Sequence, residues 1–356
     1  MFTRRMLPVS ILLTLVLTLM VTASVSAQEA EDLGGQAVFR DADAASDSLV
    51  MDFSGVPALP EGSAYEGWLL DADGGNLSVG ILIRTGTADI VETYVSPSGE
   101  NLLASYSRFA ISVEPVPDAE PETPGPIAYS DTIPAGAFLH VGHLVVAFGP
   151  NPDSKGIAVG FVEQMAVASV HANLARSSST LANQQKHSQH VINIVEGTGG
   201  ANFDASPGNP GDGLGVLAYG ADLVKHAQLA KDAAPEDESV VDGADDAIAA
   251  TETAIVFAER AREEALLVVA SGTSEFRVGK ALDNMVSLTT LGVSDAEAAY
   301  IASQDIALFE GNAGEGDAPP AVGDALVPAA AMAALLVGLL LTGAGGLLFF
   351  RRRQTA

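Results

Sequence analysis

The sequence has 356 residues, a formal net charge of −28 and no cysteine. The absence of cysteine excludes disulfides, thiolate zinc sites and cysteine nucleophiles. All 45 acidic residues but only 12 of the 17 basic residues lie between two apolar ends, so residues 28–325 have a formal charge of −33. Because such a field repels phosphate backbones, we expect no nucleic-acid partner.

The first 27 residues have the pattern of a secretory signal peptide. Arg4 and Arg5 precede an apolar run over 7–21, and small residues lead up to Ala27, after which we expect cleavage. The alternative is an uncleaved N-terminal anchor. The run is short for a membrane span, so the pattern favours a signal peptide over residues 1–27.

The C-terminal end has the pattern of a transmembrane helix. Residues 326–350 carry no charge and are followed by three arginines, Arg351–Arg353. About 25 residues at ~1.5 Å each cross the hydrocarbon core with some tilt. Because basic residues mark the cytoplasmic side, we expect a cytoplasmic tail at 351–356 and a single-pass cell-membrane protein whose bulk is extracytoplasmic.

The same apolar run could instead form a buried core helix or belong to a sorting signal for covalent attachment to a cell wall. An acidic Gly/Pro-rich linker at 312–325 precedes the run, which argues against a core helix. No LPxTG-type element lies upstream, which argues against wall attachment. Membrane retention is the simpler prediction.

Residues 36–150 alternate short apolar runs with Gly, Pro, Asp and Asn. The runs include SLVMDFSGV, NLSVGILIRT and FAISVEPV. Their close spacing predicts an antiparallel β-sandwich of roughly 110 residues. Trp68, the only tryptophan, lies in one such run, where we expect it to fill a core or inter-sheet position rather than to stack on a ligand.

Residues 151–311 are rich in alanine and have helical periodicity, which predicts an up-and-down bundle. The fold class is therefore α+β multidomain: the β-sandwich, then the helical bundle, then the transmembrane helix. Gly292 is expected to end one helix, and Ser294 with Glu297 to cap the next. The ranges 156–183 and 184–196 are expected to form one bent helix or two successive helices. Further helices are expected over 214–231, 239–270, 274–291 and 294–309.

The stretch KHSQHVINIVEG places His187 and His190 three residues apart, so the two rings are neighbours on one helix surface. They predict a zinc-type site that Glu196, or a histidine of another helix such as His171 or His226, would complete. The alternative is that these histidines hydrogen-bond a neighbouring helix or the loop that begins at Gly197. That alternative needs fewer conditions, and we prefer it on sequence alone.

The loop GANFDASPGNPGDGLG contains Asp204 and Asp212 together with Asn202 and Asn209. Oxygen ligands on a flexible loop suit calcium, which makes the two aspartates candidate ligands. The sequence lacks a strict alternating Asp/Asn series, and a tight turn followed by an Asp cap would use the same residues. The turn and cap are the favoured interpretation, and no cofactor is required by the sequence.

Three ordered motifs in the β-rich region carry a family resemblance. They comprise Tyr65, Trp68 and Leu69, then Glu114 and Pro115, then Thr123, Gly125 and Pro126, with Pro124 inserted. With these motifs, residues 36–134 resemble the extracellular C-terminal domain of anti-sigma-K (RskA-type) factors. The resemblance implies an extracytoplasmic location and a sensing or binding role.

The family resemblance has a limit in the rest of the chain. Such factors place a cytoplasmic sigma-binding region before the membrane span, whereas here a signal peptide precedes the domain and the expected tail is RRRQTA. We therefore expect no sigma inhibition by this chain alone.

These features predict a membrane-anchored extracytoplasmic binding, sensing or surface-structural protein, with the membrane and an extracytoplasmic protein as partners. One alternative is an accessory regulator of an envelope signalling system. Another is an exported metal-dependent enzyme of the helical-bundle type, similar to imelysin-like proteins, although their GxHxxE motif is absent. No GxSxG, HExxH or SxxK motif occurs, so the sequence favours a protein that is not an enzyme.

Overall fold

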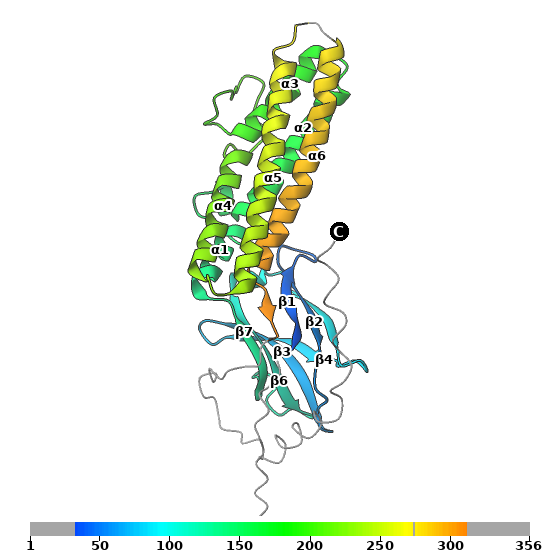
Figure 1. Ribbon diagram of the computed structural model, residues 1–356, viewed down its shortest axis with the longest axis vertical. Helices are drawn as coiled ribbons and strands as arrows, with labels where there is room; N and C mark the ends of the chain where they lie inside the picture. The colour runs from blue at the N-terminus through cyan, green and yellow to red at the C-terminus, as the bar shows by residue number, and fades with distance from the viewer. Residues whose placement is uncertain (1–32, 273–274, 312–356) are drawn as a thin grey trace, which may run out of the picture. The chain divides into compact units, whose positions relative to one another are not determined.

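The computed structural model describes residues 33–272 and 275–311 (Figure 1). The predicted signal peptide, linker, transmembrane helix and tail lie outside these residues. Two antiparallel sheets and six α-helices occur in the described part, so the chain is an α+β protein.

Each sheet has four strands. Sheet A has the order β5-β2-β1-β8, with β5 Ile90–Val95, β2 Ser48–Ser54, β1 Gly34–Arg40 and β8 Phe309–Glu310. Sheet B has the order β4-β3-β6-β7, with β4 Asn76–Leu82, β3 Ser63–Asp71, β6 Tyr106–Pro115 and β7 Ile127–Thr132.

An aromatic core joins the two sheets. Phe53 of sheet A stacks on Phe109 of sheet B with ring centroids 5.9 Å apart. Phe309 of β8 contacts Phe39 at 5.5 Å and Phe109 at 5.9 Å. Because β8 pairs with β1, the chain returns to sheet A after the helical region and completes this core. This strand lies inside the range 151–311 that the sequence assigned to the bundle.

Trp68 is a core residue with 1% of its surface exposed, which leaves no face for a ligand to stack on. Its Nε1 donates to Ser112 Oγ at 2.9 Å, and the Ser112 hydroxyl donates to the Glu114 carboxylate. The backbone N–H of Gly125 donates to the same carboxylate at 2.7 Å. These bonds link residues of all three motifs that carry the family resemblance.

The helical region contains helices that pack along one another, with α5 and α6 side by side in Figure 1. One of them, α1, falls in the range that the sequence assigned to the sandwich. Its segment FLHVGHLVVAF is apolar and rich in valine, which is also the composition of a buried strand. The helices are α1 Ala135–Val145, α2 Ile157–Ser177, α3 Leu181–Glu196, α4 Val216–Ala233, α5 Glu238–Val269 and α6 Glu275–Asp305.

The predicted break between two final helices is wrong, because α6 runs without interruption through Gly292, Ser294 and Glu297. Gly292 is explained by packing instead of by a helix end. A Cβ at this position would lie 2.3 Å from Met165 Cε of α2. The glycine therefore allows α2 and α6 to approach closely.

Among the described residues, α2 is the one helix whose length and apolar composition would allow it to span a membrane. Its Ile157, Phe161 and Met165 are fully buried, and it packs against α3, α4 and α6. A core helix of a bundle has the same composition, so α2 is weak support for a membrane span.

Candidate metal centres

All six histidines of the chain fall into two groups of three. The α1–α4 triad consists of His140, His143 and His226, and the α2–α3 triad of His171, His187 and His190. Within each triad, one potential ligand atom per residue lies within 4.8 Å of the others. Each triad takes two rings from a His-x-x-His pair on one helix and the third from a neighbouring helix.

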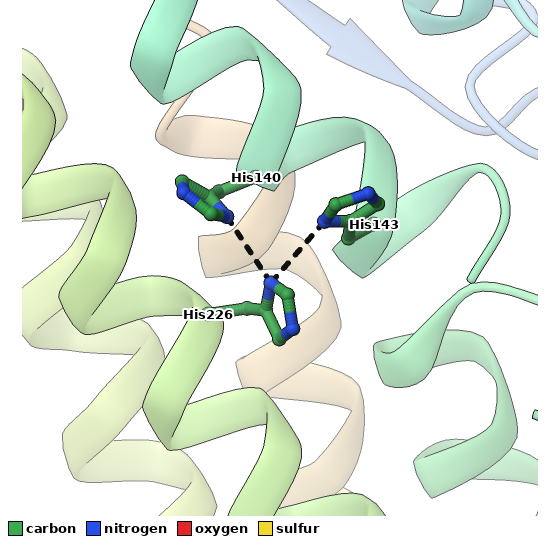
Figure 2. A group of neighbouring side chains, drawn as sticks. All are labelled: His140, His143 and His226. Carbon is green, nitrogen blue, oxygen red and sulfur yellow. Dashed lines mark hydrogen bonds between the residues drawn. The ribbon is translucent and has the colours of Figure 1, made fainter. Parts of the chain in front are cut away.

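In the α1–α4 triad, His140 and His143 lie on one surface of α1, and α4 packs along that helix. Figure 2 shows the His226 ring facing both of them. The Nδ1 atom of His226 is 3.2 Å from Nδ1 of His140 and 3.3 Å from Nδ1 of His143. The Phe148 ring packs against His226 and His143, with centroids 4.9 and 5.3 Å away.

The α2–α3 triad repeats this arrangement on another pair of helices. The Nδ1 atom of His171 is 3.2 Å from Nδ1 of His187 and 3.1 Å from Nδ1 of His190. In addition, Nε2 of His190 is 2.9 Å from the carbonyl oxygen of Pro207. A carbonyl only accepts, so His190 Nε2 carries the hydrogen, and in the neutral ring the lone pair is then on Nδ1.

Hydrogen bonding between the rings is a poor fit to the geometry of either triad. In a neutral imidazole, each nitrogen has either one hydrogen or one lone pair. The central Nδ1, of His226 in one triad and of His171 in the other, faces two further Nδ1 atoms and has one hydrogen or one lone pair to share between them. A cation that accepts all three lone pairs would satisfy every ring.

The spacing of the nitrogens fits a tetrahedral metal ion. Zinc–nitrogen bonds of about 2.0–2.1 Å at tetrahedral angles place the nitrogens about 3.3 Å apart. The Nδ1 atom of each central ring, His226 or His171, lies 3.1 to 3.3 Å from Nδ1 of its two partners, and all three ligand atoms of each triad lie within 4.8 Å of one another. Three imidazoles suit Zn²⁺, Cu²⁺ or Ni²⁺ and leave a fourth position for water or another small ligand.

Burial keeps several of these rings neutral near pH 7. Desolvation, with the nearby rings His190 and His187 adding to it, lowers the pKa of His171 to about 4. Desolvation and the neighbouring rings of its triad likewise lower the pKa of His226 to about 4. Desolvation also lowers the pKa values of His140 and His187. Neutral rings present lone pairs to a metal without first releasing protons.

We expect the metal-free chain to lose stability as the pH falls from about 6.5 to about 4. The unfolded rings take up protons below a pKa of about 6.5, whereas the folded pKa of His171 and of His226 is about 4. The unfolded state binds more protons throughout this window, so acid favours it. Denaturant unfolding with a chelator present measures the free energy of unfolding at each pH. The double variant His171→Gln, His226→Gln should lose less of this free energy than the unsubstituted chain. Equal losses in both chains would contradict this expectation.

The other residues that the sequence offered for a transition metal are placed as follows. His171 joins His187 and His190, whereas His226 belongs to the α1–α4 triad. Glu196 lies outside both triads: its carboxylate accepts from the backbone and side-chain N–H groups of Asn202, both at 2.7 Å, and lies 3.6 Å from Arg262.

The candidate calcium ligands serve the loop itself. The Asp204 carboxylate accepts the N–H of Ser206 at 2.8 Å. The Asp212 carboxylate accepts the N–H of Leu214 at 3.0 Å and the hydroxyl of Tyr219 at 2.7 Å. Within the described residues, neither aspartate belongs to a group of three or more potential ligands.

His140 and His143 were missed as candidate ligands by the sequence interpretation. Their spacing is the same as that of His187 and His190, so a search for every His-x-x-His pair would have found them. Their segment lies in the range 36–150 that the sequence assigned to the sandwich, whereas it forms α1. Two pairs and two single histidines are the full set needed for two three-histidine sites.

Residues 17–127 match the model of a protein family, the anti-sigma-K factor rskA, C-terminal. The match confirms the resemblance predicted from the sequence motifs. No curated protein and no solved structure matches the chain. The family match ends before the first histidine, so both triads lie outside the region that resembles anti-sigma-K factors.

Proposed function

We propose that this chain is a membrane-anchored extracytoplasmic metal-binding protein, with one transition-metal ion at each histidine triad. The observation that carries the proposal is the convergence of all six histidines into two groups, in each of which one central Nδ1 faces the Nδ1 atoms of the two other rings. The region resembling anti-sigma-K factors supports a sensing or binding role outside the cytoplasm.

Equilibrium dialysis of the detergent-solubilised full chain against Zn²⁺ or Cu²⁺ tests this proposal. We expect two ions per chain, and one ion per chain for either His171→Gln or His226→Gln. Each substitution removes the central ring of one triad and leaves the other intact. Gln185→Met is a control that should keep both ions, because Gln185 bonds carbonyls at the end of α5. Fewer than two ions in the unsubstituted chain would contradict the proposal.

Release of a truncated chain tests the membrane anchor. Removing residues 325–356 takes away the predicted span and its arginines, so the remaining chain is expected to appear in the medium instead of the membrane fraction. Cell fractionation with an antibody against the β-rich region measures this. A truncated chain that stays with the membrane would favour the N-terminal anchor, since the family match begins at residue 17, inside the N-terminal apolar run.

A second candidate function is an accessory regulator of envelope signalling, which the family match favours because anti-sigma factors act on protein partners. Under this proposal, deletion of the gene changes transcription from a sigma-dependent envelope promoter. Unchanged transcript levels across envelope stress would exclude this role.

The proposed metal sites share one feature with the alternative, an exported metal-dependent enzyme, and lack another. Three imidazoles with a free fourth position occur in catalytic zinc sites. Within the described residues, neither triad includes a carboxylate that would act as a general base. Binding or sensing is therefore the function that we propose.

A further inference from the structure

The loop between α3 and α4, residues 197–215, is attached to α3 by a buried amide. Asn193 is fully buried. Its Nδ2 donates to the carbonyls of Asp204 at 2.7 Å and Gly208 at 3.1 Å, and its Oδ1 accepts the N–H of Asp204 at 3.0 Å. One side chain therefore holds both sides of the segment that includes Pro207.

Two neighbours of Asn193 on α3 hold the same loop. The Nε2 of Gln189 donates to the carbonyl of Asn202 at 2.8 Å and to Asn193 Oδ1 at 3.0 Å. The Nε2 of His190, a member of the α2–α3 triad, donates to the carbonyl of Pro207 at 2.9 Å. The loop is thus attached both to the helix and to a candidate ligand.

We propose that the 197–215 loop is a clamp for the α2–α3 metal site, in which Asn193 is the positioning residue. Asn193 fixes the loop so that the Pro207 carbonyl holds His190 with its Nδ1 lone pair toward the metal. This inference rests on the proposed metal-binding function. Partners that orient a ligating histidine in this way contribute 10–100-fold in metal affinity.

The α1–α4 triad supplies an internal comparison. Within the described part of the chain, its rings contact one another and Phe148, and no backbone carbonyl bonds a ring nitrogen as Pro207 does for His190. The two sites are therefore unequal: the α2–α3 site holds its ion more tightly, and the α1–α4 site exchanges its ion more readily.

The clamp is tested by measuring Cu²⁺ affinity of the full chain at one site at a time. His226→Gln isolates the α2–α3 site, and His171→Gln isolates the α1–α4 site. Asn193→Leu removes the amide that holds the loop. Gly208→Ala perturbs the loop backbone, because Gly208 has a φ of +99° that alanine does not adopt without strain, and the added Cβ would lie 3.9 Å from Nε2 of His190. Gln185→Met is the matched control, since Gln185 also donates to backbone carbonyls from α3 but contacts α5.

We expect Asn193→Leu and Gly208→Ala each to weaken Cu²⁺ binding at the α2–α3 site by at least about 10-fold and to change its electron paramagnetic resonance spectrum. In these two variants the Cu²⁺ affinity of the α1–α4 site should stay within about 2-fold of its value without the substitution. In Gln185→Met the affinities of both sites should stay within the same limit. Unchanged affinity at the α2–α3 site, or equal weakening at both sites, would overturn the clamp. If the unsubstituted triads bind no Cu²⁺, the proposed function itself fails.

Discussion

Saturating Zn²⁺ is expected to raise the free energy of unfolding of the full chain by about 5 kcal/mol. A ligand that binds only the folded state contributes about 2.7 kcal/mol per site when its free concentration is 100 times the Kd. Two independent triads double this gain. The histidines lie on α1, α2, α3 and α4, so unfolding of the bundle separates the ligands.

Denaturant unfolding with and without metal measures this gain. His171→Gln, which removes the tighter α2–α3 site, should reduce the gain by more than half and His226→Gln by less than half, and the double variant should show none. The chelator-treated variants provide the baseline for any effect of the substitutions on the fold. Equal unfolding midpoints of the unsubstituted chain with metal and with chelator would contradict the account.

Phe309→Ala is expected to lower the free energy of unfolding by about 3–5 kcal/mol, the cost of removing a buried phenyl ring. Phe309 is fully buried and its ring contacts Phe39 and Phe109, which belong to different sheets. The lost ring would leave a cavity where the two sheets meet. Leu267→Ala is the control, because Leu267 is 61% exposed and its truncation should cost little. A loss below about 1 kcal/mol for Phe309→Ala would contradict this description of the core.

The position of Phe309 also determines which residues are needed to complete the sandwich. A fragment that ends at residue 150 contains seven strands but lacks β8, and with it one ring of the aromatic core. The end of α6 is tied to β1 by an ion pair between Arg40 and Asp305 at 2.6 Å. The sandwich therefore depends on residues that follow the helices in sequence.

The sequence predicted helices from local signals such as periodicity and capping residues, but it did not predict features that depend on contacts between distant segments. Asp237 caps α5 by accepting the N–H of Val240, next to the predicted helix start at 239. Thr180 caps α3 by accepting the N–H of Asn183, inside the range 156–183 that was predicted as one helix. The strand β8 was not predictable in the same way, because two residues carry no periodicity and its stability comes from pairing with β1. At Gly292, where the sequence predicted a helix end, the uninterrupted α6 packs against Met165 of another helix, a contact that sequence spacing does not reveal.

The candidate site was also predictable only in its local part. The spacing of His187 and His190 places two rings on one helix surface, which sequence periodicity is able to predict. The third ring of each triad depends on which helices pack together. Sequence reasoning offered both His171 and His226 for the first pair, and the packing of α3 on α2 selects His171. His226 is selected in turn by the packing of α4 on α1.

Anomalous diffraction from crystals grown with Zn²⁺ tests the central claim most directly, because it locates each ion and its ligands. We predict two anomalous peaks, one about 2.0–2.1 Å from Nδ1 of His140, His143 and His226 and one at the same distance from Nδ1 of His171, His187 and His190. The absence of both peaks, or peaks at Asp204 and Asp212 with the triads empty, would contradict the account.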